Sequence, residues 1–131
     1  MPQSPTFTPP SRSWRAKFAD AFRGLREGSR GQTSFVVHLL FAAAVVTAAA
    51  VFRMGWIEWA LLVVCIALVL TAEMFNSALE SMARAITSER NPHIEKGLNV
   101  ASAAVLLASL GAAAAGVMLF AHRLGEPAGW W

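Results

Sequence analysis

Four polar side chains interrupt an apolar run in the middle of the chain. Glu73, Asn76, Ser77 and Glu80 are spaced i, i+3, i+4 and i+7, which places all four on one face of an α-helix. The two glutamates are then ~10 Å apart along the helix axis. A carboxylate and an amide one turn apart can bind a hard cation such as Mg²⁺ through oxygen. A carboxylate near a membrane surface can also act as a general base toward a lipid hydroxyl.

The depth of Glu73 in this apolar run is a second indication of function. A carboxylate inside a membrane span is costly unless it is paired or hydrated, so it marks a functional site by default. The structural alternative is a polar knot, in which Glu73 is hydrogen-bonded to hydroxyls or amides of neighbouring helices. Such a pair does not need two acids, an amide and a hydroxyl in a row, and the four residues together therefore favour a functional site.

The elements that must position this face are membrane spans. Apolar segments lie at about 35–52, 56–79 and 100–121, and each is close to the ~20 residues that a helix needs to cross a ~30 Å hydrocarbon core. Backbone groups in lipid must be hydrogen-bonded within their own segment, so these spans are helices. We therefore predict an all-α integral membrane protein with three transmembrane helices, forming one domain over residues 14–122.

A further helix is predicted before the first span, at about residues 14–28. Its apolar residues form one stripe and its basic residues lie mainly off that stripe, which is typical of an amphipathic helix in the membrane interface. Packing of the same stripe on the bundle is the alternative. Residues 1–13, rich in Pro, Ser and Thr, predict a disordered tail, and residues 123–131 a short outer tail. The stripe consists of Trp14, Phe18, Ala21, Phe22 and Leu25.

The positive charge is distributed around the spans. The net charge is +3, but the basic residues build no basic face, which argues against nucleic acid as a partner. Nine of them precede the first span or lie between the second and third, and two lie on the other side. We expect the protein to lie in the cell's inner (plasma) membrane. The positive-inside rule then places the N-terminus in the cytoplasm and the C-terminus on the outer side of that membrane. The nine are Arg12, Arg15, Lys17, Arg23, Arg26, Arg30, Arg84, Arg90 and Lys96; the two are Arg53 and Arg123.

The third span is rich in alanine, glycine and serine between Ala101 and Gly116. Small residues let helices approach closely in a bilayer, so this span is predicted to be a packing surface. Oligomerisation would help three short helices to bury their polar positions. We interpret His38, about one turn into the first span, as a hydrogen-bonded interfacial residue, with metal ligation as the alternative.

The polar face also carries a family resemblance. The run Glu73-Met74-Phe75-Asn76-Ser77-Ala78-Leu79-Glu80 resembles the signature Glu-x-x-Asn-Ser/Thr-Ala-x-Glu of the prokaryotic diacylglycerol kinase family, which includes the undecaprenol kinases. The resemblance covers about residues 14–120. Its other parts are Phe35-Val36-Val37-His38-Leu39, Ile57-Glu58-Trp59, Ile66-Ala67-Leu68 and Ala101-Ser102-Ala103-Ala104-Val105-Leu106.

The resemblance implies a homotrimer of three-span subunits with a surface helix. Such a protein transfers the γ-phosphate of ATP to the hydroxyl of a membrane lipid, diacylglycerol or undecaprenol, using Mg²⁺ at cytoplasmic sites between subunits. Glu80 is by this resemblance the catalytic base and a metal-linked carboxylate, and Gln32 stands at a second metal position. The implied nucleotide-binding residues are Glu73, Asn76, Glu89, Asn99 and Lys96.

Several positions depart from the family's pattern. Gln32 stands where the family has a metal-binding acid, and Arg84 stands where it has an aspartate. The pair Leu98-Asn99 replaces Lys-Asp, and Arg90-Asn91 replaces Tyr-His. These differences leave a second reading open, a catalytically impaired family member that serves as a lipid-binding or structural membrane protein. A third reading is a small ion-coupled exporter with a membrane-embedded glutamate.

Lys96, two residues from the replaced lysine, and Arg84 could supply the positive charge that phosphoryl transfer requires. We expect kinase activity to fall when both are removed in an Arg84→Ala, Lys96→Ala double variant, measured as phosphate transfer from labelled ATP to lipid. Normal activity in that variant would count against this compensation.

Overall fold

The computed structural model describes residues 13–29 and 33–125, which form four helices. They are α1 (Trp14–Ser29), α2 (Thr33–Val51), α3 (Trp56–Ile86) and α4 (Pro92–Gly125). The last three are long and apolar enough to cross a membrane, and the predicted all-α membrane fold is confirmed. The tail predicted at 1–13 lies outside the described residues except for Ser13, and Gln32 also lies outside them. The outer tail predicted at 123–131 starts too early, because residues 123–125 continue α4, and its remaining residues lie outside the described part of the chain.

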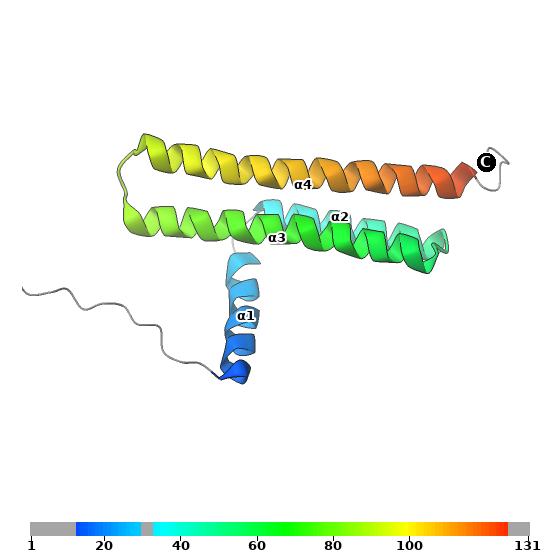
Figure 1. The fold of residues 1–131 in the computed structure, drawn as a ribbon, viewed down its shortest axis with the longest axis horizontal. Coiled ribbons are helices and arrows are strands. Elements are labelled where there is room, and N and C mark those ends of the chain that lie inside the picture. The colour runs from blue at the N-terminus through cyan, green and yellow to red at the C-terminus, as the bar shows by residue number, and fades with distance from the viewer. Residues whose placement is uncertain (1–12, 30–32, 126–131) are drawn as a thin grey trace, which may run out of the picture.

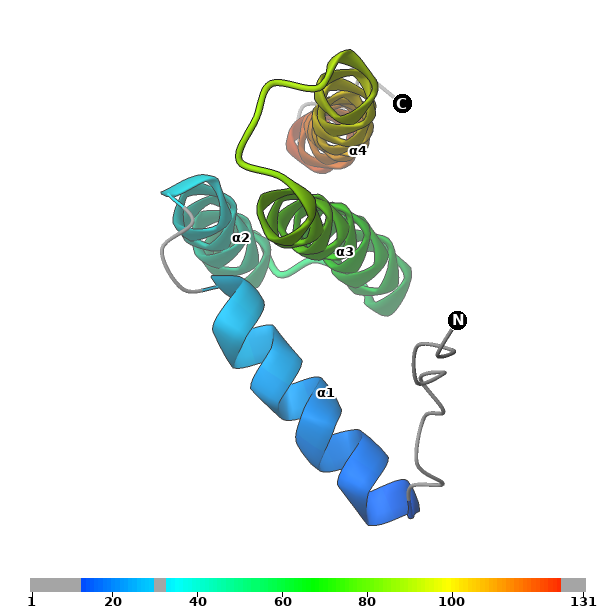
Figure 2. The ribbon, with the colours of Figure 1, turned by 90° about the vertical axis from the view of Figure 1, so that its left-hand side faces the viewer.

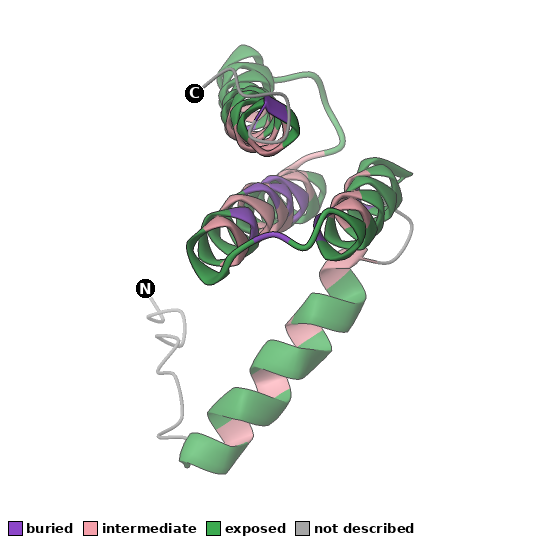
Figure 3. Ribbon diagram, turned by 90° about the vertical axis from the view of Figure 1, so that its right-hand side faces the viewer, coloured by how far each residue is buried: buried purple, intermediate pink, exposed green. Residues whose placement is uncertain are grey.

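The three long helices lie side by side, and α1 crosses them at a steep angle (Figures 1 and 2). The central helix is α3, which packs against each of the other three. Its contact with α4 is the most extensive, and its contact with α1 involves only the end of α1. Buried residues accordingly gather on α3, as Figure 3 shows.

Two of the helices are longer than the apolar spans that the sequence predicts. The predicted spans end at residue 79 and begin at residue 100, whereas α3 continues to Ile86 and α4 begins at Pro92. With its 31 residues, α3 is roughly 46 Å long at the usual helical rise, well beyond a ~30 Å hydrocarbon core. The ends of α3 and α4 that meet at their connecting loop therefore project past the level at which α1 joins α2 (Figure 1).

Local capping explains where α3 ends and where α4 begins. At Thr87 the backbone becomes extended and the helix α3 ends. The side-chain Oδ1 of Asn91 accepts hydrogen bonds from the backbone N–H groups of His93 and Ile94 at 2.9 and 3.4 Å. These bonds satisfy donors that the first turn of α4 would otherwise leave without partners. Pro92 occupies the first helical position, where its fixed φ is favourable.

The apolar stripe of α1 faces outward. Trp14, Phe18 and Phe22 are all more than 60% exposed, so this part of the stripe does not pack on the bundle of this chain, whereas Leu25 lines a hollow together with residues of α3. That exposure favours the interfacial position for α1 over the packed alternative. The helix is joined to the bundle at its end, where Gly28 lies so close to the Met74 side chain that a Cβ atom at Gly28 would clash with it.

The turn between α2 and α3 is held by the far end of α4. Arg123 donates from Nε to the carbonyl oxygen of Phe52 at 3.1 Å and from Nη2 to that of Arg53 at 2.8 Å. Arg53 has a φ of 52°, which is a left-handed backbone conformation that residues other than glycine adopt only rarely. Beside it, the rings of Phe52 and Phe120 meet edge to face with centroids 5.8 Å apart. A small core of Ala49, Met54 and Leu62 lies underneath.

We expect Arg123→Met to lower the stability of the protein by about 1 kcal/mol, because two carbonyl oxygens lose their donors. Arg123→Lys should recover only part of the loss, since an ammonium cannot reproduce the planar guanidinium fork. The measurement is the thermal unfolding midpoint in detergent, with Arg15→Met on exposed α1 as the matched control. Equal midpoints for Arg123→Met and Arg15→Met would contradict the role of this clamp.

Candidate functional site

Glu73 is the most deeply buried large side chain of the described residues, with 2% of its surface exposed. Both of its carboxylate oxygens have partners on α2. Ser34 donates from Oγ to Oε2 at 3.0 Å, and His38 Nε2 lies 3.1 Å from Oε1. A buried carboxylate is tolerable when its oxygens are hydrogen-bonded in this way. The polar contacts of Glu73 therefore join α2 to α3 at the end of the bundle nearest α1.

The sequence analysis predicted only part of this grouping of Ser34, His38 and Glu73. His38 is indeed hydrogen-bonded, as predicted, but neither its partner nor the part of Ser34 was identified. A signal was present, because Ser34 and His38 are four residues apart and therefore share one face of α2. Pairing that face with Glu73 requires the tertiary arrangement, which no local pattern contains.

Two turns along the same face of α3, Glu80 lies in a more accessible position. Its carboxylate accepts a hydrogen bond from Asn76 Nδ2 at 3.0 Å and lies 3.7 Å from Nη1 of Arg84. The Glu80 side chain is 31% exposed, whereas Asn76 and Ser77 are buried. The face thus runs from a buried, fully paired acid at Glu73 to a partly exposed acid at Glu80.

Two polar atoms on this face have no partner within the described residues. They are Asn76 Oδ1 and Ser77 Oγ, both buried. Unsatisfied buried polar atoms are rare in native proteins and usually indicate that a water, an ion or another chain supplies the missing contact. A third such atom is Ser109 Oγ on α4.

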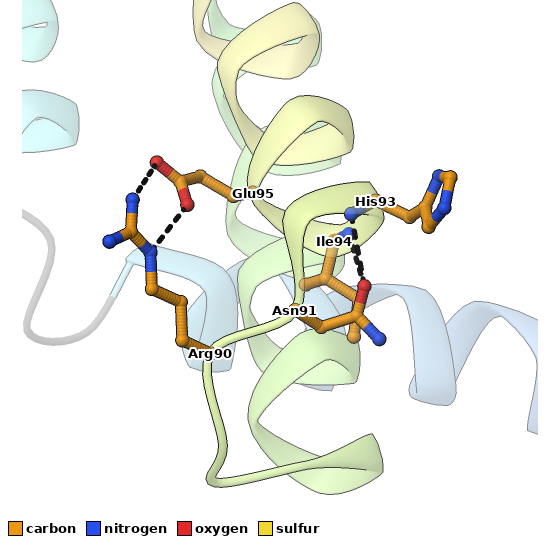
Figure 4. Close-up of polar contacts among 5 residues, drawn as sticks. All are labelled: Arg90, Asn91, His93, Ile94 and Glu95. Carbon is orange, nitrogen blue, oxygen red and sulfur yellow. Dashed lines mark hydrogen bonds and ion pairs between the residues drawn. The ribbon is translucent and has the colours of Figure 1, made fainter.

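The α3–α4 loop is held by contacts of Arg90 and Asn91. Arg90 makes a two-pronged contact with Glu95, from Nε at 3.0 Å and from Nη2 at 3.3 Å (Figure 4). Asn91 caps α4, as described above, and the imidazole of His93 points away from the Arg90–Glu95 pair. Glu89 lies in this loop and is exposed, with its backbone N–H donating to Thr87 Oγ1. The loop geometry thus rests on Arg90 and Asn91 themselves.

Lys96 and Asn99 lie together on the first turns of α4. They line a shallow groove of about 470 Å³, and the whole groove is formed by one face of this helix. Its lining consists of Pro92, Glu95, Lys96, Asn99, Val100 and Ala103. The cation of Lys96 and the amide of Asn99 are groups of the type that bind phosphate. Glu95 in the same groove carries a negative charge, which opposes such binding.

The predicted site residues thus fall into two groups. Glu73, Asn76 and Glu80 share one face of α3, while Lys96 and Asn99 share the groove on α4. Within residues 13–29 and 33–125, no three His, Cys, Asp or Glu side chains come together as a metal site. Gln32, predicted as a metal position with Glu80, is outside the described residues.

Comparison with known proteins decides the family. A sequence model of the family described as "Prokaryotic diacylglycerol kinase" matches residues 19–120, a range that includes the whole acidic face and most of α1. The chain belongs to the prokaryotic diacylglycerol kinase family. It is also similar to the undecaprenol kinase of Bacillus subtilis (strain 168), with 26% identity over 107 residues, covering 82% of this chain and 87% of that protein.

Membership of this family gives the chain its general function, which is lipid phosphorylation. The face is formed as the signature requires, but its surroundings differ from the family's pattern at positions visible in the fold. Arg84 contacts Glu80 where the family has an aspartate, and Asn99 lines the α4 groove where the family has the acid of its Lys-Asp pair. Arg84 thus places a positive charge on α3 beside the accessible glutamate.

The Ser34–Glu73 hydrogen bond generates a stability prediction. We expect a double-mutant cycle of Ser34→Ala and Glu73→Gln to give a coupling of about 0.5–1.5 kcal/mol, within the range measured for hydrogen bonds between membrane helices. Chemical unfolding in detergent provides the free energies. The control cycle pairs Ser34→Ala with Glu58→Gln at the other end of α3 and should be additive. Additivity in both cycles would mean that the bond contributes nothing to holding α2 on α3.

Proposed function

We propose that this protein is an ATP-dependent lipid kinase with Glu80 as its essential carboxylate. It transfers the γ-phosphate of ATP to the hydroxyl of a membrane lipid. The observation that carries the proposal is the face of Glu73, Asn76 and Glu80 inside a sequence that belongs to a lipid kinase family. Asn76 donates to Glu80 and so fixes the accessible carboxylate for work at the membrane surface.

The lipid substrate that we propose is a polyprenol. Support comes from the similarity to an undecaprenol kinase over most of both chains and from the likeness of the second span to that branch of the family. Diacylglycerol is the competing substrate, and both lipids present a primary hydroxyl at the end of apolar chains. A direct comparison of the two lipids in one assay distinguishes them.

The residues at the accessible end of the face fit Mg²⁺ carried with ATP. Magnesium prefers oxygen ligands and is usually held by one or two carboxylates together with substrate phosphates and water. Glu80 supplies such a carboxylate, and Gln32 would supply an amide oxygen in place of the usual acid. When bound, the ion would offset charge on the phosphates. Asn76 and Glu89, with Lys96 and Asn99 on α4, are the proposed nucleotide-binding residues. Glu73, which the family resemblance also assigns to the nucleotide, is buried and paired with Ser34 and His38 in the single chain.

We further propose that the active protein is a homotrimer in the cell's inner membrane, with its N-terminus in the cytoplasm. Three buried polar atoms without partners, on Asn76, Ser77 and Ser109, support a contact with another chain. The apolar surface of α4 is largely exposed in the single chain, and its small residues suit close helix packing. The excess of basic residues at the α1 and α3–α4 loop end supports the orientation.

One observation favours the alternative of a catalytically impaired relative. The guanidinium of Arg84 lies 3.7 Å from the Glu80 carboxylate, and a cation so close competes with a metal ion for the same oxygens. In that case the protein would bind lipid or pack with other subunits without transferring phosphate. An active kinase and an impaired relative predict opposite results in an assay of phosphate transfer to lipid.

We expect the purified protein in lipid nanodiscs to transfer label from γ-labelled ATP to undecaprenol in the presence of Mg²⁺. Glu80→Gln should lower the rate by about 10²-fold or more, because the charge that the reaction requires is lost while the side chain keeps its size. Glu58→Gln, the same change at the opposite end of α3, is the matched control and should retain the rate.

Each outcome has a distinct meaning. Transfer to diacylglycerol but not to undecaprenol would overturn the polyprenol assignment and keep the kinase. An undiminished rate in Glu80→Gln would remove Glu80 from the mechanism. No transfer to either lipid by a folded oligomer would favour the impaired relative. In that event Gln32→Glu, Leu98→Lys and Asn99→Asp are the reversions that should restore transfer.

A further inference from the structure

We propose that Arg90 makes the α4 groove attractive to phosphate by neutralising Glu95, the acid that lines it. The inference rests on the proposed function and deepens it, because it names the residue that sets the charge of the proposed nucleotide site. Arg90 is a positioning residue in this proposal, since it acts on the nucleotide through Glu95 and makes no contact with the nucleotide itself.

The groove by itself has no net charge. Its lining contains two ionisable side chains, Glu95 and Lys96, whose opposite charges cancel. Both are exposed, as is Asn99 about one turn further on, so all three are accessible to a ligand. Leu98, which stands where the family has a lysine, is half-buried and is not part of the lining. Without Arg90, the phosphates of a nucleotide in this groove would therefore meet one cation and one anion.

The position of Glu95 is set by the start of α4. Its backbone N–H donates to the carbonyl oxygen of Asn91 at 2.9 Å, and it is the acidic residue of the helix's first turn. A carboxylate in the first turn is stabilised by the positive end of the helix dipole. The same position lies on the face that forms the groove, because Glu95 and Asn99 are four residues apart. An acid that favours the start of the helix thus lies where phosphate would bind.

Arg90 neutralises this carboxylate by contacting both of its oxygens. Nε donates to Oε2 at 3.0 Å and Nη2 donates to Oε1 at 3.3 Å (Figure 4). A two-pronged guanidinium contact is stronger and more closely defined in geometry than a contact of one ammonium group. Lys96 cannot take this role, because successive residues of a helix do not face each other, and the imidazole of His93 points away from the pair. With Glu95 paired, the groove presents the positive charge of Lys96.

The exposure of the pair determines how large its effect on a ligand can be. The Arg90 side chain is 84% exposed and that of Glu95 is 49% exposed, so water and dissolved salt screen both charges. A carboxylate left without its partner beside the phosphates would then weaken ATP binding by about threefold to tenfold and would not abolish it. The effect should also become smaller as the ionic strength rises, whereas a change in the conformation of the loop would persist in salt.

The test is a double-mutant cycle in which ATP binding is measured without catalysis. The protein in nanodiscs that lack undecaprenol and diacylglycerol is equilibrated with labelled ATP and Mg²⁺. We expect Arg90→Gln to raise the Kd for ATP about threefold to tenfold at low salt, and by a smaller factor at about 0.5 M salt. In a Glu95→Gln background, Arg90→Gln should leave the Kd unchanged. Arg23→Gln, which removes an exposed arginine paired with Asp20 on α1, is the matched control and should bind ATP like the wild type.

Every result of this cycle bears on the proposal. A loss of affinity that persists in the Glu95→Gln background would mean that Arg90 contacts the nucleotide directly, and it would overturn the proposal. An unchanged Kd in Arg90→Gln, or a loss that salt does not reduce, would overturn it as well. Absence of ATP binding by the wild type would overturn both this inference and the proposed function. The expected pattern of binding in a protein that transfers phosphate to neither lipid would refute the proposed function alone.

Discussion

The arrangement of this molecule depends on one carboxylate that must be satisfied without water. Glu73 is buried where α2 meets α3, and both of its oxygens accept from side chains of α2. An unpaired carboxylate at this position would be prohibitively costly in an apolar environment. Rotating either helix, or sliding one past the other by a turn, would break both contacts. The pairing therefore selects one register for α2 on α3 from many that the apolar surfaces alone would accept.

That register has consequences further along α3. Once Glu73 faces α2, helical geometry directs Asn76, Ser77 and Glu80 to the same side. The length of α3 then separates the two acids by environment, since Glu73 remains buried while Glu80 lies at the projecting end of the helix with 31% of its side chain exposed. One rigid element thus presents a buried anchor and an accessible carboxylate, and it does so on the helix that all the other helices contact.

The sequence predicted those features that depend on local periodicity. Hydropathy located three spans, and the 3.6-residue period placed the four polar residues on one face and the apolar stripe along α1. The helices α3 and α4 extend beyond the predicted apolar spans because hydropathy reports apolar composition, whereas backbone hydrogen bonding continues until Thr87 and Asn91 interrupt it. A hydrogen bond from Glu73 to a hydroxyl of a neighbouring helix was the structural alternative for this acid, and the Ser34 contact is such a bond. The sequence could not name Ser34 as the partner, and the Arg90–Glu95 contact was missed, because each joins residues whose proximity is created by folding.

The positions that depart from the family's pattern are themselves integrated into the fold. Arg90 and Asn91 replace another pair, yet one clamps Glu95 and the other caps α4. Both residues thus help to define the loop between α3 and α4. Arg84 is different, because its contact is with the accessible acid of the signature itself. A cation at this distance lowers the negative potential at Glu80 and competes for its oxygens, but it also attracts the phosphates of a nucleotide. Whether Arg84 impairs or assists the site is thus decided by which partner is present, the carboxylate alone or the carboxylate together with bound phosphate.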